Sequence, residues 1–268
     1  MPFFTSNGAN IHIDVAGSET GTPILFVHGF TLDHRQWAPQ REVLAASHRV
    51  FRMDLRGHGR SARAVRGHSW TGLAADVHRA LVQVGMDRLQ PGFLVGHSIS
   101  ADAVLQTALA EPRALKGIVI AAPSVWGWEF SPEWKALIHE MRRHAAARDL
   151  TRALDTFRAD PVFAGVRAQP MLETAVRSMQ ASFSGESLLS DEIDSGVPTL
   201  ERLGECKTPL LVVRAERDRD DFRAAAAEVA ARVPRAHVVD IDGSGHFPNL
   251  EAPQAFDRAL HDFFAEHA

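Results

Sequence analysis

The chain has 268 residues, of which 45% are hydrophobic and 23% charged, a composition typical of a folded globular enzyme and incompatible with extensive disorder. Its formal net charge of −4 gives no indication of binding to nucleic acid or to an anionic membrane. Cys206 is the single cysteine, and no segment has the pattern of a signal peptide or membrane span, so we expect a cytoplasmic protein without disulfides.

Short apolar runs along the chain predict the strands of a sheet. Ile11, Ile13 and Val15 alternate with polar residues, which is typical of a half-exposed strand near a sheet edge. Continuous runs that are apolar on both faces, as in parallel strands covered by helices, follow at 24–27, 50–53, 93–95, 117–120, 210–213 and 237–239. Helical spacing of apolar residues is found at 69–85, 99–111, 220–232 and 251–266. This alternation predicts an α/β fold with a mostly parallel sheet.

The stretch from 124 to 195 interrupts the alternation. It contains no strand-like run, but helical spacing is found around 131–147, 149–158 and 170–181. We therefore expect a core made of residues 1–123 and 196–268, with residues 124–195 inserted as a helical cap. Ligands of open α/β sheets bind outside the carboxyl ends of the strands, so a cap there would form half of the pocket.

Ser98 is the candidate nucleophile. It lies between the apolar run 93–95 and the helix predicted from 99, next to Gly96. A serine on such a tight turn points its hydroxyl outward, and the helix behind it presents free N–H groups. The arrangement is that of a G-x-S-x-G elbow, except that Ser100 stands where the second glycine is expected.

A serine nucleophile needs a base that a carboxylate orients. His246 follows the run at 237–239 in a glycine-rich loop, and Asp218 follows the run 210–213. Asp220 and Asp221 are alternatives for the acid, although they are typical of the first turn of the next helix. Asp102 is better explained as a buried hydrogen-bonding residue, and His97 as a packing residue of the elbow.

Attack on a carbonyl places negative charge on its oxygen, which requires N–H donors already in position. We expect one donor to be the backbone N–H of Ile99, the residue after the nucleophile. The second would be the N–H of Phe30, in the loop after the strand 24–27, where Gly29 allows a close approach of the backbone.

Taken together, these residues resemble the α/β-hydrolase superfamily, specifically its capped esterase-like members. The resemblance rests on His28-Gly29-Phe30, residues 54–61, Gly96-His97-Ser98, Asp218 and Gly245-His246-Phe247 followed by Glu251-Ala252-Pro253. It implies an eight-stranded, mostly parallel sheet, a cap inserted after the sixth strand, and a Ser–His–Asp hydrolase with no cofactor or metal. Serine at position 98 argues against the dehalogenases of this fold, which have aspartate there.

The expected reaction is hydrolysis of a carboxylic ester or lactone of a small, hydrophobic substrate through an acyl-enzyme. Two other enzymatic reactions use the same triad: hydrolysis of a C–C bond and perhydrolysis. A third possibility is a slow ligand-sensing hydrolase, because Ser98-Ile99-Ser100-Ala101 is similar to the elbow of hormone-receptor hydrolases. The small-molecule substrate is the only partner that the sequence indicates, and the oligomeric state stays open.

The aromatic residues at the start of the predicted cap are candidates for the substrate pocket. They are Trp126, Trp128, Phe130 and Trp134. An alternative is that these side chains seat the cap on the core instead of lining a pocket.

Overall fold

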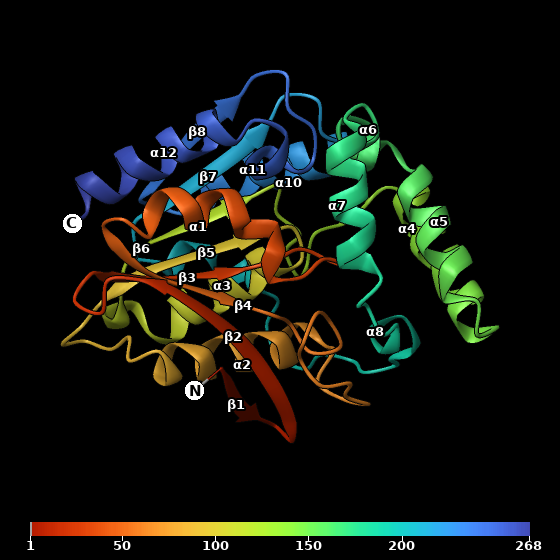
Figure 1. Ribbon diagram of the computed structural model, residues 1–268, viewed down its shortest axis with the longest axis horizontal. Coiled ribbons are helices and arrows are strands. Elements are labelled where there is room, and N and C mark those ends of the chain that lie inside the picture. Colours follow the sequence, from red (N-terminus) through yellow and green to blue (C-terminus); the bar gives the residue numbers. More distant parts are fainter. Residues whose placement is uncertain (1) are drawn as a thin grey trace.

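Eight strands form one continuous sheet in the computed structural model, which describes residues 2–268. The strands are β1 (Phe3–Ser6), β2 (Ala9–Gly17), β3 (Thr22–Val27), β4 (His48–Met53), β5 (Gly92–His97), β6 (Leu115–Ala121), β7 (Leu210–Ala215) and β8 (Ala236–Ile241). Their spatial order is β1-β2-β4-β3-β5-β6-β7-β8 (Figure 1). β2 pairs antiparallel with β1 and β4, and the other neighbours are parallel. The predicted mostly parallel sheet of eight strands is confirmed.

Burial explains why the central strands could be recognised. Every residue of β5 is buried, and β6 has a single half-buried residue, Lys116. Strands covered on both faces read as continuous apolar runs. β8 is an edge strand with several exposed residues, and its apolar run is correspondingly short.

Helices cover both faces of the sheet. The core helices and 3₁₀ turns are η1 (His34–Trp37), α1 (Ala38–Leu44), α2 (Trp70–Gln83), α3 (Ser100–Ala110), η2 (Pro112–Ala114), α9 (Thr199–Arg202), η4 (Leu203–Glu205), α10 (Asp220–Arg232), α11 (Pro248–Glu251) and α12 (Pro253–Glu266). Side chains of α2, α3 and α10 share one apolar cluster with the sheet, and those of α1 and α12 share another on the opposite face. Among residues 2–268, no helix is both long enough and apolar enough to cross a bilayer.

Two helical features differ from the prediction. The helix expected over 251–266 is present as α12 (Pro253–Glu266), but a separate short helix, α11, precedes it and ends at Glu251, because Pro253 cannot continue a preceding helix. Between β3 and β4 the chain forms η1 and α1, which no predicted element covers. Pro39 lies in the first turn of α1, where its missing N–H is tolerated.

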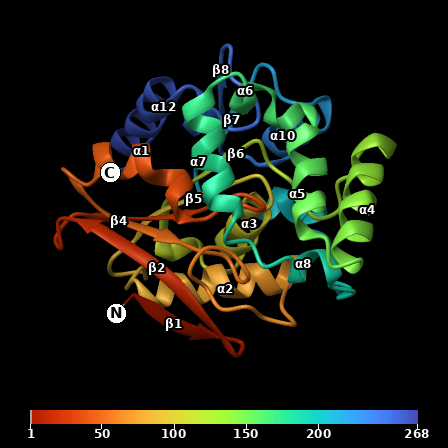
Figure 2. The same cartoon turned by 45° about the vertical axis from the view of Figure 1, so that its right-hand side comes forward.

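The chain between β6 and β7 is helical and contains α4 (Pro132–Ala146), α5 (Leu150–Ala159), η3 (Pro161–Phe163), α6 (Ala164–Arg167), α7 (Pro170–Gln180) and α8 (Glu186–Leu189). We call the segment from α4 to α8 the cap. It follows the sixth strand, as expected, and its longer helices stand together beside the sheet in both views (Figures 1 and 2). Its apolar side chains cluster with Leu32, Phe222 and Phe247 of the core.

The register of the parallel strands aligns their carboxyl ends. Val27 of β3 pairs with Gly96 of β5, and Ala121 of β6 pairs with both His97 of β5 and Val213 of β7. The loops that follow these strands therefore leave the same edge of the sheet. We call this edge, with its loops, the core edge.

Candidate active site

Ser98 lies on a sharp turn between β5 and α3. Its φ is +54°, a left-handed conformation that is strained for a residue with a side chain. Main-chain hydrogen bonds hold it there, because its N–H donates to the Ala121 carbonyl at 2.9 Å and its carbonyl accepts from the N–H of Ser124 at 3.0 Å. The elbow predicted from the sequence is present.

The two residues that flank the elbow have different tasks. A Cβ at Gly96 would lie 2.6 Å from Cγ2 of Val104, so glycine is required for α3 to pass close to β5. The Ser100 hydroxyl accepts from the His97 N–H at 2.8 Å and donates to the Val27 carbonyl at 2.8 Å. The serine in place of the second glycine therefore ties the elbow to β3.

Ser98, His246 and Asp218 come together at the core edge. The Ser98 hydroxyl lies 3.1 Å from Nε2 of His246, and Nδ1 of His246 lies 2.9 and 3.0 Å from the two Asp218 carboxylate oxygens. With Nδ1–H donated to Asp218, Nε2 is the acceptor for the Ser98 O–H. All three residues are buried, and Ser98 is the one that opens onto the cavity.

The alternative acids are engaged elsewhere. Asp220 is almost fully exposed, and Asp221 accepts from the N–H and hydroxyl of Ser131. Asp102 accepts from the N–H of Trp126 at 2.9 Å, and burial raises its pKa to about 6. Asp218 is the carboxylate that contacts the His246 ring.

Two side chains that sequence reasoning did not single out as site residues hold the His246 loop. The Glu251 carboxylate accepts from the N–H of Gly245 at 2.7 Å and of Phe247 at 3.1 Å, on either side of the histidine. Burial raises the pKa of Glu251. Nε2–H of His97 donates to the His246 carbonyl at 2.7 Å. Glu251 is three residues beyond Pro248 in the sequence, and nothing in its local pattern shows that it folds back.

The two expected oxyanion donors lie at the same place. Phe30 and Ile99 both line the cavity onto which Ser98 opens. Within residues 2–268, neither backbone N–H donates to a protein acceptor. Both amides are therefore available to a ligand beside the Ser98 hydroxyl.

The cavity between the core edge and the cap has a volume of about 420 Å³. Its apolar lining includes Phe30 and Ile99 from the core and Trp134, Phe157 and Leu188 from the cap. This volume lies in the lower part of the range for small-molecule sites.

The expected pocket residues Trp126, Trp128 and Phe130 are absent from the lining of this cavity, which corrects the prediction. They precede α4, in the segment that leaves the core beside the returning chain, where the Trp126 carbonyl accepts from the N–H of Leu200. Phe130 packs on Phe222 with ring centroids 5.8 Å apart. Of the four candidate aromatics, Trp134 lines the cavity, because it lies on the cap helix that faces the core.

Polar groups form the end of the cavity near α2. Glu192 accepts from the N–H groups of Gly67 and His68, and Asp194 accepts from those of Trp70 and Thr71. Carboxylates at a helix N-terminus are stabilised by its unpaired N–H groups. These contacts fasten the chain that returns from the cap to the core, and no local sequence pattern indicated them.

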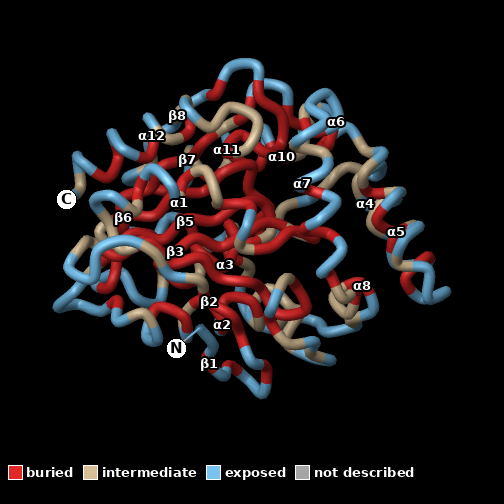
Figure 3. The backbone as a smooth tube through the Cα atoms, viewed as in Figure 1, coloured by how far each residue is buried: buried red, intermediate tan, exposed pale blue. Residues whose placement is uncertain are grey.

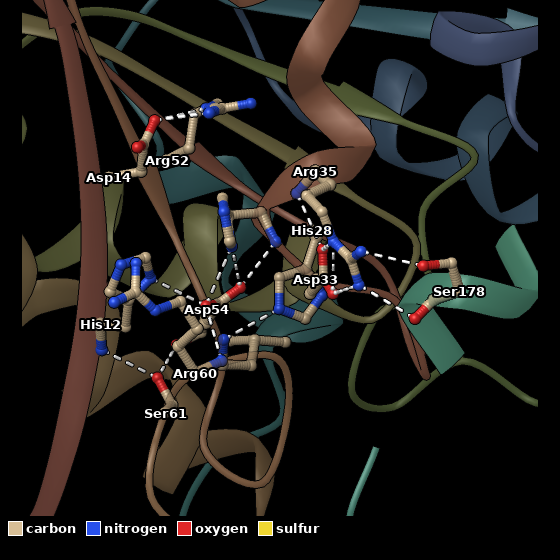
Figure 4. A network of polar contacts seen from close by, with 12 residues as sticks. His12, Asp14, His28, Asp33, Arg35, Arg52, Asp54, Arg60, Ser61 and Ser178 are labelled. Atoms are coloured by element: carbon tan, nitrogen blue, oxygen red, sulfur yellow. Dashed lines mark hydrogen bonds and ion pairs between the residues drawn. The ribbon is translucent and has the colours of Figure 1, made fainter. Parts of the chain in front are cut away.

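A second polar network surrounds the Asp54 carboxylate (Figure 4). The buried Asp54 carboxylate accepts from Nδ1 of His12 at 2.8 Å, from the N–H of His34 at 2.6 Å and from that of Arg60 at 3.0 Å. Burial alone would raise the pKa of Asp54, but the bonds from His12 and His34 hold it well below its ordinary value. The network fixes the turn at 54–61 against β2 and η1.

Comparison with known proteins agrees with this architecture. The model of the alpha/beta hydrolase family matches residues 24–259. A putative carbamate hydrolase, RutD, of Azorhizobium caulinodans is 27% identical over 99% of both chains. A pimeloyl-[acyl-carrier protein] methyl ester esterase of Xanthomonas campestris is 30% identical over 95% of this chain and 99% of its own.

Among solved structures, the enol-lactonase from Burkholderia xenovorans LB400 superposes with a TM-score of 0.83 at 20% identity, covering 98% of this chain and 100% of its own. At this identity the likeness shows the fold alone. The family match and the esterase relative go further, because they extend over nearly the whole sequence. The chain belongs to the alpha/beta hydrolase family as an esterase-like member.

Proposed function

We propose that the protein hydrolyses a carboxylic ester or lactone of a small, largely apolar molecule through an acyl-enzyme on Ser98. The observation that carries this proposal is the relay of Ser98, His246 and Asp218, with contacts of 3.1 and 2.9 Å, beside a cavity of about 420 Å³. The relay gives the serine a base, and the cavity gives the substrate a place beside it.

The first chemical step is attack of the Ser98 oxygen on the substrate carbonyl. His246 takes the hydroxyl proton on Nε2, and the Asp218 carboxylate stabilises the imidazolium through Nδ1–H. The N–H groups of Phe30 and Ile99 bind the negative oxygen of the tetrahedral intermediate. His246 then gives the proton to the leaving alcohol, and the acyl group stays on Ser98.

The second step releases the acyl group. Water donates a proton to Nε2 of His246 while its oxygen attacks the acyl carbonyl, and the Ser98 oxygen leaves and recovers the proton. For a lactone, alcohol and acid are parts of one molecule, so the product is the ring-opened hydroxy acid.

The lining of the cavity supports the substrate class. Aromatic and aliphatic side chains surround the end where Ser98 opens, and Arg142, Glu192 and Asp194 stand among the lining residues of the cavity. The esterase and carbamate hydrolase relatives act, by their names, on substrates with an acyl carbonyl. Both observations favour acyl transfer to water over other reactions of the fold.

The test is the Ser98→Ala variant assayed with p-nitrophenyl acetate, butyrate and a set of lactones. Loss of one triad member typically lowers the rate by about 10⁴ to 10⁶. A fluorophosphonate probe should label the wild type at Ser98 and leave the variant unlabelled. Unchanged ester hydrolysis by pure Ser98→Ala protein would refute the proposal. A diketone, a carbamate and peroxide as acyl acceptor, assayed in parallel, distinguish C–C cleavage, carbamate hydrolysis and perhydrolysis.

A further inference from the structure

Thr31 has a backbone conformation that its side chain disfavours. Its φ is +64°, in the left-handed region, where a β-branched residue is an outlier. It directly follows Phe30 and is completely buried. Such strain persists only where surrounding contacts enforce it.

The turn that contains Thr31 orients the Phe30 N–H. Thr31 is the third residue of a turn that the Leu32 N–H closes on the Gly29 carbonyl at 3.2 Å, and Nδ1–H of His28 donates to the same carbonyl at 2.8 Å. In a trans peptide the N–H points opposite to the C=O. Because the Gly29 carbonyl is held inward by two donors, the N–H of Phe30 is directed away from them.

Two side chains clamp Thr31 in this conformation, one from the core and one from the cap. Its N–H donates to Nε2 of His58 at 3.2 Å, and its hydroxyl oxygen accepts from Nε2 of Gln180 at 3.0 Å. Nδ1–H of His58 donates to the Arg56 carbonyl, so Nε2 is free to accept. Burial lowers the pKa of His58 to about 3, which keeps this ring neutral at ordinary pH.

Gln180 is the last residue of the cap helix α7, and it is buried. Its carbonyl oxygen accepts from Nη1 of Arg158 on α5 at 2.7 Å. Both ends of the Gln180 amide are therefore hydrogen-bonded, the oxygen to Arg158 of the cap and the nitrogen to Thr31. A continuous line of hydrogen bonds runs from Arg158 through Gln180 and Thr31 to His58.

We propose that Gln180 is a positioning residue for the reaction, which holds the oxyanion donor Phe30 in place through Thr31. The cap thus completes the oxyanion site as well as the wall of the cavity. This inference rests on the proposed function, since it assigns the Phe30 N–H to the tetrahedral intermediate. Its consequence is that kcat depends on the hydrogen bond from Gln180 to Thr31 and not on the docking of α7 in general.

The helix that carries Gln180 has a second tie to the core, which supplies a matched control. Nη1 and Nη2 of Arg35 donate to the hydroxyl and carbonyl of Ser178 at 3.0 Å each, and Asp33 holds the guanidinium (Figure 4). This contact docks the same helix but does not touch Thr31. Ser178→Ala weakens the docking of α7 without altering the turn of Phe30.

The experiment compares Thr31→Val, Thr31→Ser, Gln180→Leu, the Thr31→Val/Gln180→Leu double variant and Ser178→Ala, with Ser98→Ala as reference. Thr31→Val keeps the shape and the strained backbone but removes the acceptor, whereas Thr31→Ser keeps the hydroxyl. Complete loss of an oxyanion donor lowers kcat by about 10² to 10³, so a displaced donor should lower it about tenfold. Each variant is first checked for a cooperative thermal transition.

We expect Thr31→Val and Gln180→Leu each to lower kcat about tenfold with little change in KM. The double variant should be no worse than either single one, and Thr31→Ser and Ser178→Ala should stay near the wild type. The affinity for an alkyl boronic acid, which forms a tetrahedral adduct on the serine, should fall by the same factor as kcat/KM. If Thr31→Val does not fold, Gln180→Leu against Ser178→Ala decides the question.

The inference is overturned if both single variants keep the wild-type kcat while Ser98→Ala is inactive. It is also overturned if Ser178→Ala loses as much kcat as Gln180→Leu, because the effect would then belong to the docking of α7. Full activity of Ser98→Ala would be a different failure, since it removes the proposed function itself.

Discussion

The core edge and the cap are held in place by different kinds of contact. At the core edge, main-chain bonds connect neighbouring loops, for example from the Ser98 N–H to the Ala121 carbonyl and from the Arg217 N–H to the Ser244 carbonyl. The cap is tied to the core mostly by side chains, such as Arg219 to Asp160. In Figure 3 the central strands are buried throughout, whereas the cap helices alternate between buried and exposed stretches.

This difference separates two properties of the enzyme. Main-chain bonds do not depend on side-chain identity, so the turn of Ser98 is insensitive to most substitutions around it. The His246 loop depends in addition on the side chains of Glu251 and His97. The cap contributes side chains to the lining of the cavity, among them Trp134, Phe157 and Leu188, which we call the cap wall. A substitution there changes the shape of the cavity directly. We therefore expect changes at the core edge to affect every substrate alike, and changes in the cap wall to alter the ranking of substrates.

The largest effect is expected from Asp218→Asn. Loss of the carboxylate leaves His246 in the wrong tautomer, and kcat should fall by about 10⁴ for all esters alike. Asp102→Asn is the matched control, because Asp102 is a buried residue of α3, the helix that follows Ser98, but contacts Trp126 instead of His246. Its kcat should stay within a few-fold of the wild type in steady-state assays. A greater loss in Asp102→Asn than in Asp218→Asn would reverse our assignment of the acid.

Acid should destabilise the core edge. Burial lowers the pKa of His28, His58 and His97, that of His58 to about 3 from an ordinary 6.5. Below pH 6.5 the unfolded chain binds protons that the folded chain does not, so the free energy of unfolding falls as the pH falls. His58 alone should account for about 2 kcal/mol between pH 7 and pH 5. Urea unfolding at these pH values measures the loss.

Asp102 works in the opposite direction in the same pH range. Burial raises its pKa to about 6, so the folded chain takes up this proton before the unfolded chain does, and stability is gained as the pH falls towards the ordinary value of Asp. The Asp102→Asn variant lacks this gain and should lose stability more steeply between pH 7 and pH 5. If the urea midpoint were the same at pH 7 and pH 5 both for the wild type and for Asp102→Asn, this would contradict the neutral state of the buried histidines.

Ser100→Ala tests how the elbow is tied to the sheet. The change leaves the His97 N–H and the Val27 carbonyl without the hydroxyl that bonds both, and should lower the free energy of unfolding by about 1 to 2 kcal/mol. The buried hydroxyl of Ser184 has no hydrogen-bond partner within residues 2–268, so Ser184→Ala should cost almost nothing. Equal urea midpoints for the two variants would show that the Ser100 contacts add no stability.

The smallest effect is expected from Trp134→Ala in the cap wall. The change enlarges the cavity, and should raise the preference for larger acyl groups about three- to tenfold while leaving kcat for p-nitrophenyl acetate nearly unchanged. Ratios of kcat/KM for acetate, butyrate and phenylacetate esters measure it. Trp128→Ala, outside the cavity lining, should leave these ratios as they are. An equal loss of kcat/KM for all esters in Trp134→Ala would contradict our expectation that the cap wall determines the ranking of substrates.

The core edge was largely readable from the sequence. The runs at 24–27, 93–95, 117–120 and 210–213 become β3, β5, β6 and β7, because strands buried on both faces have no room for polar residues. Since parallel strands end at one edge, the residues just after them were predicted to meet. Ser98, Asp218 and His246 do so in the structure.

The longer helices of the cap were predicted from the sequence, but the contacts they make were not. Helical spacing of apolar residues shows that one face of a helix is buried, but it does not show which element covers that face. Trp126, Trp128 and Phe130 are as aromatic as Trp134, yet only the last lines the cavity. Their positions depend on the path by which the chain leaves the core, and the local sequence pattern does not predict this path.

The sequence by itself determined the strands from β2 to β8, most of the longer helices, the sharp turn at Ser98, and which side chains follow which strand. These features are local, since they depend on the spacing of apolar residues and on the turn-forming residues within a short stretch of sequence. Only the tertiary structure decided that Glu251 folds back on the His246 loop, that Asp194 caps α2 while Glu192 holds the loop before it, and that Gln180 reaches Thr31. In each of these contacts the packing of the chain brings a polar side chain to its partner. Polar residues do not recur at a regular spacing in the sequence, so the sequence does not identify such a partner in advance.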